Sequence, residues 1–208
     1  ITLDFTLNPD FAQVESDQLV VTANQRFPIF FEEKRPFFLE GIDIFNTQIA
    51  AVHTRAIIDP DYAVKLTGKV NRNTFGLLLA SDNGPGNFSE DDRTNPNVFP
   101  GIRRFVDKNA SVGILRLKRD VGKSDSFVGF LTTYHRFVDN YNELGGFDGR
   151  FRLDKQTTFS WQVLGTHARH PFFFPEEGVT RDSKQNGFIY NIDYNQRGRH
   201  FGHEFSMV

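Results

Sequence analysis

The sequence predicts an all-β fold: an antiparallel up-and-down transmembrane β-barrel, of which this chain supplies roughly 8–10 strands. Three observations lead to this prediction. Apolar and polar residues alternate along segments of about ten residues, short and longer connections alternate between the segments, and charged residues gather on one face of them. A membrane strand needs about 9–11 residues, whereas strands of soluble proteins have about five or six.

Composition narrows the classes of function. The 24 basic and 26 acidic residues nearly balance, so we predict no nucleic-acid partner. Cysteine is absent, which excludes disulfides and thiolate metal sites. Phenylalanine is abundant, with 24 residues, and it favours pleated, partly buried surfaces. No apolar run reaches the roughly 18 residues of a membrane helix, so strands must form any membrane span.

The alternation gives the strands in order. The first spans residues 1–8, where Ile1, Leu3 and Phe5 share a face, and Pro9 ends it. Residues 9–50 are less regular, and we expect short strands, turns and a short helix there. We divide the chain into residues 1–50, an N-terminal strand with a charged and aromatic plug-like or lumen segment, and residues 51–208, the barrel strands. Within residues 51–208, the alternation predicts strands at 51–58, 62–70, 74–82, 111–120, 126–137, 143–154, 157–166, 187–195 and 200–208.

The connections between these strands differ in length in a regular way. The short connections are residues 71–73, 121–125, 155–156 and 196–199. The longer connections are residues 83–110, 138–142 and 167–186. In an up-and-down sheet this places the short turns at one end, as in outer-membrane barrels, whose periplasmic turns are short and extracellular loops long. The chain begins and ends inside strand patterns. We therefore expect a piece of a longer protein, whose barrel is completed by another chain or a missing segment.

The polar faces of these strands carry charges in mid-strand. In a barrel such charges line a lumen and the opposite face meets lipid, whereas in a soluble sandwich they face solvent. The alternatives differ in whether a second layer covers the apolar face, which carries Phe147, Phe151, Phe159, Trp161, Phe188 and Tyr190. The charges in question are Lys65, Lys69, Arg116, Lys118, Asp148, Arg150, Arg152 and Asp193.

Several stretches also resemble a known family: residues 7–17 (LNPDFAQVESD), residues 30–45 (FFEEKRPFFLEGIDIF), Thr54-Arg55 with Asp59-Pro60, and residues 65–69 (KLTGK). They are similar to a large uncharacterised bacterial family of predicted outer-membrane β-barrels, whose members often follow a module similar to family-nine carbohydrate-binding domains. The match is strong over about the first 70 residues. The resemblance implies a surface-exposed barrel linked to glycan or polymer handling, and it implies no catalytic residues. The carbohydrate-binding-like module is not in this chain, so sugar binding does not carry over.

The densest charge cluster lies inside the second of these stretches and comprises Glu32, Glu33, Lys34, Arg35 and Glu40. One interpretation is a salt-bridged plug or constriction that selects solutes by charge. The other, which we favour, is a structural network that ties an inward segment to lumen cations, because buried charges need partners in any case.

Four further motifs have a functional and a structural interpretation each. Asp4, Asp10, Glu15 and Asp17 would supply a carboxylate pair for glycoside hydrolysis, or merely form turns. His167 with His170, and His200 with His203, would bind metal only in a turn, because residues three apart in a strand face opposite ways. The loop 82–92 holds oxygen ligands for calcium but fits a solvated loop better. The aromatic residues of 171–177 form either a ligand patch or a cover for the barrel mouth.

We therefore predict a bacterial outer-membrane protein acting as pore, importer or surface scaffold, with membrane lipid and a glycan or small solute as partners. No cofactor, metal or catalytic residue is predicted. The residues expected to line the passage are Lys65, Lys69, Asp148, Arg150, Arg152 and Asp193. The alternative is a soluble or surface-attached β-sheet carbohydrate-active enzyme or glycan-binding protein, with acids from the first 45 residues. A third alternative is a structural subunit whose barrel is completed by another chain.

Overall fold

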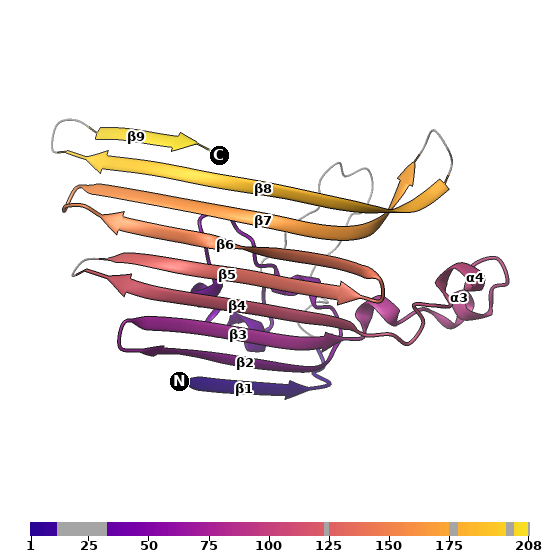
Figure 1. The fold of residues 1–208 in the computed structure, drawn as a ribbon. Helices are drawn as coiled ribbons and strands as arrows, with labels where there is room; N and C mark the ends of the chain where they lie inside the picture. The colour runs from indigo at the N-terminus through magenta and orange to yellow at the C-terminus, as the bar shows by residue number, and fades with distance from the viewer. Residues whose placement is uncertain (12–32, 123–124, 175–178, 199–201, 208) are drawn as a thin grey trace.

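Nine strands form one antiparallel sheet in chain order, from β1 to β9 (Figure 1). The structure is a computed structural model that describes residues 1–11, 33–122, 125–174, 179–198 and 202–207. The all-β, antiparallel up-and-down arrangement and the predicted range of strand number are confirmed. The edge strands β1 and β9 do not pair with each other, so the sheet is not closed into a barrel. The strands are β1 (Thr2–Leu7), β2 (Pro60–Val70), β3 (Asn73–Asp82), β4 (Ala110–Val121), β5 (Ser126–Phe137), β6 (Asn140–Arg152), β7 (Thr157–Phe174), β8 (Val179–Arg197) and β9 (Gly202–Met207).

The described helices are short and lie in the connections. Two flank a turn in the segment before β2, namely α2 (Pro36–Leu39) and the 3-10 helix η1 (Ile42–Phe45), and η2 (Thr54–Ala56) follows them. The connection from β3 to β4 holds η3 (Gly84–Gly86), α3 (Glu90–Thr94) and α4 (Phe99–Ile102). Among the described residues, no helix has the length and apolar character needed to span a membrane.

The predicted strand at 51–58 is wrong. Residues Thr54–Ala56 form η2 instead. The buried Arg35 donates hydrogen bonds to the backbone oxygens of Thr54 (2.9 Å) and Ile57 (2.6 Å), which in a sheet would bond to a neighbouring strand. A side chain distant in sequence therefore overrides the local alternation, because it satisfies the backbone without a neighbouring strand.

The predicted alternation of short and longer connections holds only in part. The β1–β2 and β3–β4 connections are long and lie at one end of the sheet, but at the same end β5 and β6 are joined by Val138 and Asp139 alone. The expected loop 167–186 is also largely strand, because β7 and β8 stay paired up to Phe174 and Val179. Antiparallel backbone hydrogen bonds do not depend on apolar side chains, so polar sequence extends these strands.

The two faces of the sheet differ in character. Residues paired across strands share a face, so Asp148, Gln162 and Gly129 lie together on the face that we call inner. The inner face buries polar side chains such as Lys65, Arg116 and Gln162. The other, which we call the outer face, carries Phe5, Leu79, Leu117, Phe147 and Phe188, all exposed.

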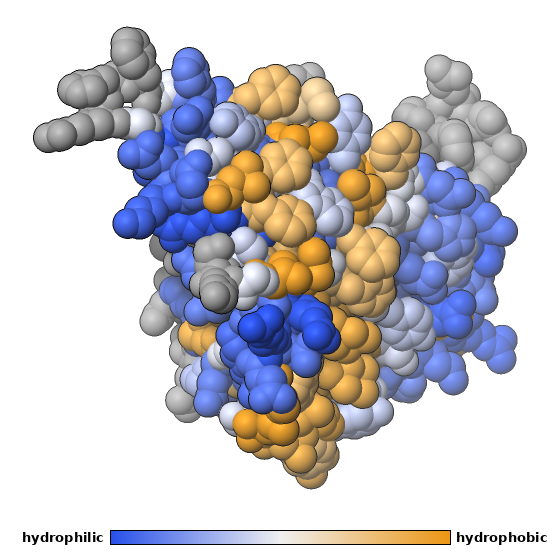
Figure 2. Space-filling model, turned by 60° about the vertical axis from the view of Figure 1, so that its left-hand side comes forward, coloured by the Kyte–Doolittle hydropathy of each residue, from blue (hydrophilic) through white to orange (hydrophobic). Residues whose placement is uncertain are grey.

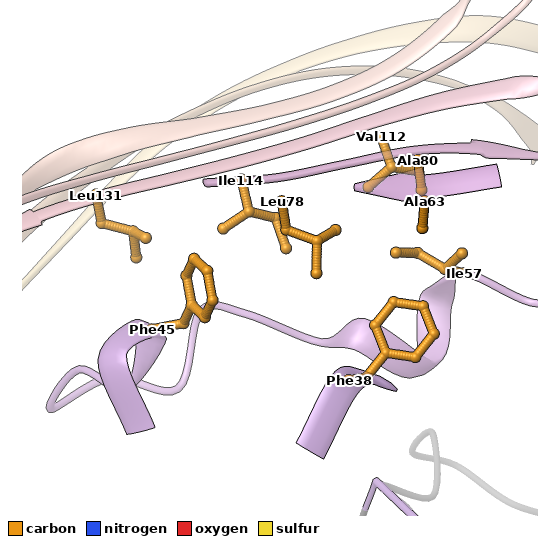
Figure 3. Packing of buried hydrophobic residues seen from close by; sticks show 9 residues of the cluster. All are labelled: Phe38, Phe45, Ile57, Ala63, Leu78, Ala80, Val112, Ile114 and Leu131. Carbon is orange, nitrogen blue, oxygen red and sulfur yellow. The ribbon is translucent and has the colours of Figure 1, made fainter. Parts of the chain in front are cut away.

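Residues 33–57, which we call the inner segment, pack on the inner face over β2 to β5, and in Figure 1 they lie behind the sheet. Phe38, Phe45 and Ile57 point toward the strands (Figure 3). Gly76 makes room for the Phe45 ring, since a Cβ there would lie 2.8 Å from its Cζ. The segment reaches β7 as well, where Gln162 Oε1 accepts a hydrogen bond from the Ile49 backbone N–H at 2.7 Å. In the apolar core, Phe38, Phe45 and Ile57 pack together with residues of the strands, namely Ala63, Leu78, Ala80, Val112, Ile114 and Leu131.

Candidate functional site

The predicted charge cluster contains a buried pair, Glu33 and Arg35. The Arg35 guanidinium donates to both Glu33 carboxylate oxygens at 2.8 Å and lies over the rings of Phe11 (5.0 Å) and Phe38 (4.3 Å). The Thr54 hydroxyl donates to the same carboxylate at 2.6 Å. Burial alone would raise the pKa of Glu33, but the hydrogen bonds from Arg35 and Thr54 lower it to about 2. The pair joins the two ends of the inner segment.

The other members of the cluster lie elsewhere. Lys34 and Glu40 are exposed, and Glu32 lies outside the described residues. The backbone carbonyl of Glu40 accepts a hydrogen bond from Lys65.

Lys65, predicted to line a passage, is fully buried beneath the inner segment. Its Nζ donates to the carbonyls of Phe37 (2.6 Å) and Glu40 (2.7 Å) and forms an ion pair with Asp4 at 3.2 Å. It thereby supplies donors to carbonyls of α2 and the turn that follows it. Both Lys65 and Asp4 are occupied by structural contacts.

Asp148 is buried too, in a bidentate ion pair with Arg116 that crosses over β5. The strand in between carries Gly129 at this point, and a Cβ there would lie 2.6 Å from Arg116 Nη1 and 2.6 Å from Asp148 Oδ1. Only a residue without a side chain leaves space for the pair. Lys65, Asp148 and Arg116 are therefore unavailable to line an open passage.

The remaining predicted residues converge at the end of the sheet that carries the short turns. Lys69, Arg150, Arg152 and Asp193 line two adjoining hollows of about 560 and 440 Å³, which share Asp125 and Arg150. We call the two together the inner hollow. Seven cationic side chains and three carboxylates line it. The cations are Lys69, Arg72, Lys118, Arg150, Arg152, Lys155 and Arg197, and the carboxylates are Asp120, Asp125 and Asp193.

Two of the carboxylates already have cationic partners. Lys69 Nζ lies 2.6 Å from Asp120, and Arg152 Nη1 lies 3.2 Å from Asp125. The sequence places Lys118 on the same polar face as Arg116, but we did not predict it as a residue of the passage. Arg72, Lys155 and Arg197 were not predicted, because they lie in turns or at a strand end. There the alternation of the sequence does not tell which side of the sheet a residue faces. A hollow of this composition can bind anions.

The other candidate motifs form no site among the described residues. His167 and His170 both lie in β7, so they face opposite ways. Asp82 is fully buried and accepts from the backbone N–H groups of Ile58, Asp59 and Gly84, which shapes the start of the loop that was considered for calcium. The described part of the chain contains no group of three His, Cys, Asp or Glu suited to a metal. Glu15, Asp17, His200 and the side chains of 171–177 lie outside the described residues.

Comparison with known families gives one match. Residues 1–55 match a family described as a domain of unknown function (DUF5916). The resemblance to an uncharacterised family is thus confirmed over the first quarter of the chain. No curated protein and no solved structure matches it.

Proposed function

We propose that this chain is part of a bacterial outer-membrane β-barrel, with its outer face toward lipid and its inner face toward a passage for small solutes. The observation that carries the proposal is the inverted polarity of the two faces. Phe188 and Phe147 on the outer face are 78% and 59% exposed, whereas Gln162 on the inner face is 0% exposed. Burying polar groups beneath an exposed apolar face stabilises a protein in lipid and not in water.

The extent of the apolar surface supports the proposal. Figure 2 shows apolar residues gathered in a band that runs across the strands, with polar residues on both sides. None of the described elements forms a second layer over Phe147 or Phe188. Strands β2 to β6 have 10 to 13 residues, enough to cross the hydrocarbon layer with a tilt. An exposed apolar band that continues across several strands marks a contact with a membrane or with a protein partner.

The free edges of the sheet fit the same proposal. Each of β1 and β9 has a partner on one side only in the nine-stranded sheet. Unpaired backbone groups are costly in hydrocarbon, so a spanning sheet must close. We propose that strands from another segment or another chain complete the barrel.

The inner segment would narrow the resulting passage. Its apolar core covers β2 to β5 and a hydrogen bond ties it to β7. Solute would then pass beside this segment, along a wall that includes the inner hollow. We therefore favour a charge-lined passage over a purely structural scaffold.

The test begins with fractionation of cells that produce the full-length protein. We expect it in the outer-membrane fraction, resistant to carbonate washing, and extracted only by detergent. In planar bilayers or liposomes the purified protein should conduct ions. Recovery in detergent-free buffer would contradict the proposal.

A further inference from the structure

Two cations in the inner hollow flank one aromatic ring, and neither forms an ion pair with a carboxylate of the described residues. Lys118 Nζ lies 4.1 Å from the centroid of the Phe127 ring, and the Arg150 guanidinium carbon lies 6.0 Å from it. The three residues come from β4, β6 and β5, and Phe127 pairs directly with Arg150 in the sheet register. Within the described part of the chain, no carboxylate forms an ion pair with Lys118 or Arg150.

The carboxylates around these cations do not balance them. Asp120 is held by Lys69 and Asp125 by Arg152, which leaves Asp193 against the remaining cations of the hollow. An excess of one charge sign in a concave site raises the local concentration of counter-ions of the opposite sign. The hollow therefore carries an excess of positive charge and attracts anions.

The donor types define the chemistry that would fill it. A guanidinium presents a planar fork that matches a carboxylate or sulfate, and an ammonium acts as a point charge. Ser160 and Asn195 add neutral hydrogen-bonding groups on the same wall. We infer that the inner hollow binds an anionic solute with two or more carboxylate groups, held between Lys118 and Arg150.

This inference rests on the proposed function and deepens it. The hollow lies at the end with the short turns, which in outer-membrane barrels is the periplasmic end. A bound anion would therefore sit on the periplasmic side of the inner segment. Binding itself does not require insertion in a membrane.

The test is calorimetric titration of the full-length protein in detergent with three probes: trigalacturonate, tricarballylate and maltotriose. We expect both carboxylate probes to bind and maltotriose not to bind. The double variant Lys118→Gln with Arg150→Gln should weaken binding by about tenfold or more, since it removes both charged donors that hold the anion. Tighter binding of trigalacturonate than of tricarballylate would identify an acidic saccharide as the source of the carboxylates.

The matched control is Arg119→Gln with Arg136→Gln, which removes two charges from the outer face of β4 and β5. It should leave binding within about twofold, because neither residue lines the hollow. Attraction that depended on net charge alone would be weakened equally by both double variants. The single variants keep the test readable where the double variant unfolds. Absent anion binding, equal binding of maltotriose, or equal losses in both double variants would overturn the inference. A binding protein that fractionates as soluble would contradict the proposed function only.

Discussion

A single glycine allows the buried bidentate ion pair between Arg116 and Asp148 on the inner face. Arg116 and Asp148 are 32 positions apart in sequence and meet over Gly129. Gly129→Ala would place a methyl group between the two side chains. Separating a buried pair leaves uncompensated charge, so we expect a loss of about 3 kcal/mol in the free energy of unfolding.

Urea unfolding of the purified full-length protein measures this loss, with Gly145→Ala as the matched control. At Gly145 a Cβ would lie no closer than 3.7 Å to any neighbour. We expect this control to unfold at the same urea concentration as the unsubstituted protein, because alanine fits the space. Equal effects of the two substitutions would contradict the role given to Gly129.

The Glu33 carboxylate makes stability depend on acid pH. Its pKa is lowered from 4.5 to about 2 in the folded state. A lowered folded-state pKa contributes stability above the unfolded-state value, and this contribution is lost as the pH falls from about 4.5 to 2. The contribution is on the order of 3 kcal/mol, since one pKa unit corresponds to about 1.4 kcal/mol.

Thermal unfolding between pH 2 and 7 checks this prediction in Glu33→Gln. The variant should be less stable at pH 7, and the difference from the unsubstituted protein should vanish near pH 2. Glu40→Gln, an exposed change in the same segment, should keep the original pH dependence. A Glu33→Gln variant with the same pH slope as the parent protein would refute the effect.

At the scale of elements, the inner segment is held by a few aromatic side chains and by Lys65 from the sheet. Phe45 fills the space above Gly76, and Lys65 takes the carbonyls of Phe37 and Glu40. The segment has no strand partners of its own. Its attachment therefore depends on side-chain burial, which tertiary packing alone supplies.

Phe45→Ala should loosen this segment while the sheet stays folded. Truncation of a buried Phe costs about 3–5 kcal/mol, and the loss would fall on the contact between segment and sheet. Trypsin cleavage after Arg55 should therefore accelerate by about tenfold or more. Leu39→Ala, which shortens a 43% exposed side chain in the same segment, should not change the cleavage rate. Unchanged cleavage in Phe45→Ala would show that other contacts hold the segment.

At the scale of the whole molecule, the environment of the outer face decides between lipid and water. Phe147 lies in the middle of β6, and Leu153 follows the strand at its turn end. In a membrane barrel an arginine at the midplane costs about 2–4 kcal/mol and one near the interface about 0–1. In water both exposed positions would accept arginine at little cost.

The comparison of Phe147→Arg with Leu153→Arg measures this difference. We expect Phe147→Arg to reduce the folded yield in lipid vesicles and Leu153→Arg to leave it near the parent value. The folded fraction follows from the gel mobility of unheated samples, since folded barrels migrate differently from unfolded chains. Equal yields for both variants would favour an aqueous outer face.

The sequence alone determined most of the sheet. Period-two alternation located β2 to β6 to within a few residues and assigned Lys69, Lys118 and Arg150 to one face, because neighbouring residues of a strand must point to opposite sides. Nearest-neighbour pairing followed from the short turns. The first 55 residues also carried the family resemblance.

Only the tertiary structure decided which inner-face charges are occupied and which face the hollow. Residues 51–58 alternate like a strand, yet Arg35 takes their carbonyls and η2 forms. In the sequence, Lys65 and Arg150 are both mid-strand cations of the polar face. In the structure, Lys65 is buried under the inner segment, whereas Arg150 lines the inner hollow. The physical reason is range: alternation is a property of adjacent residues, whereas charge pairing depends on groups that only folding brings together.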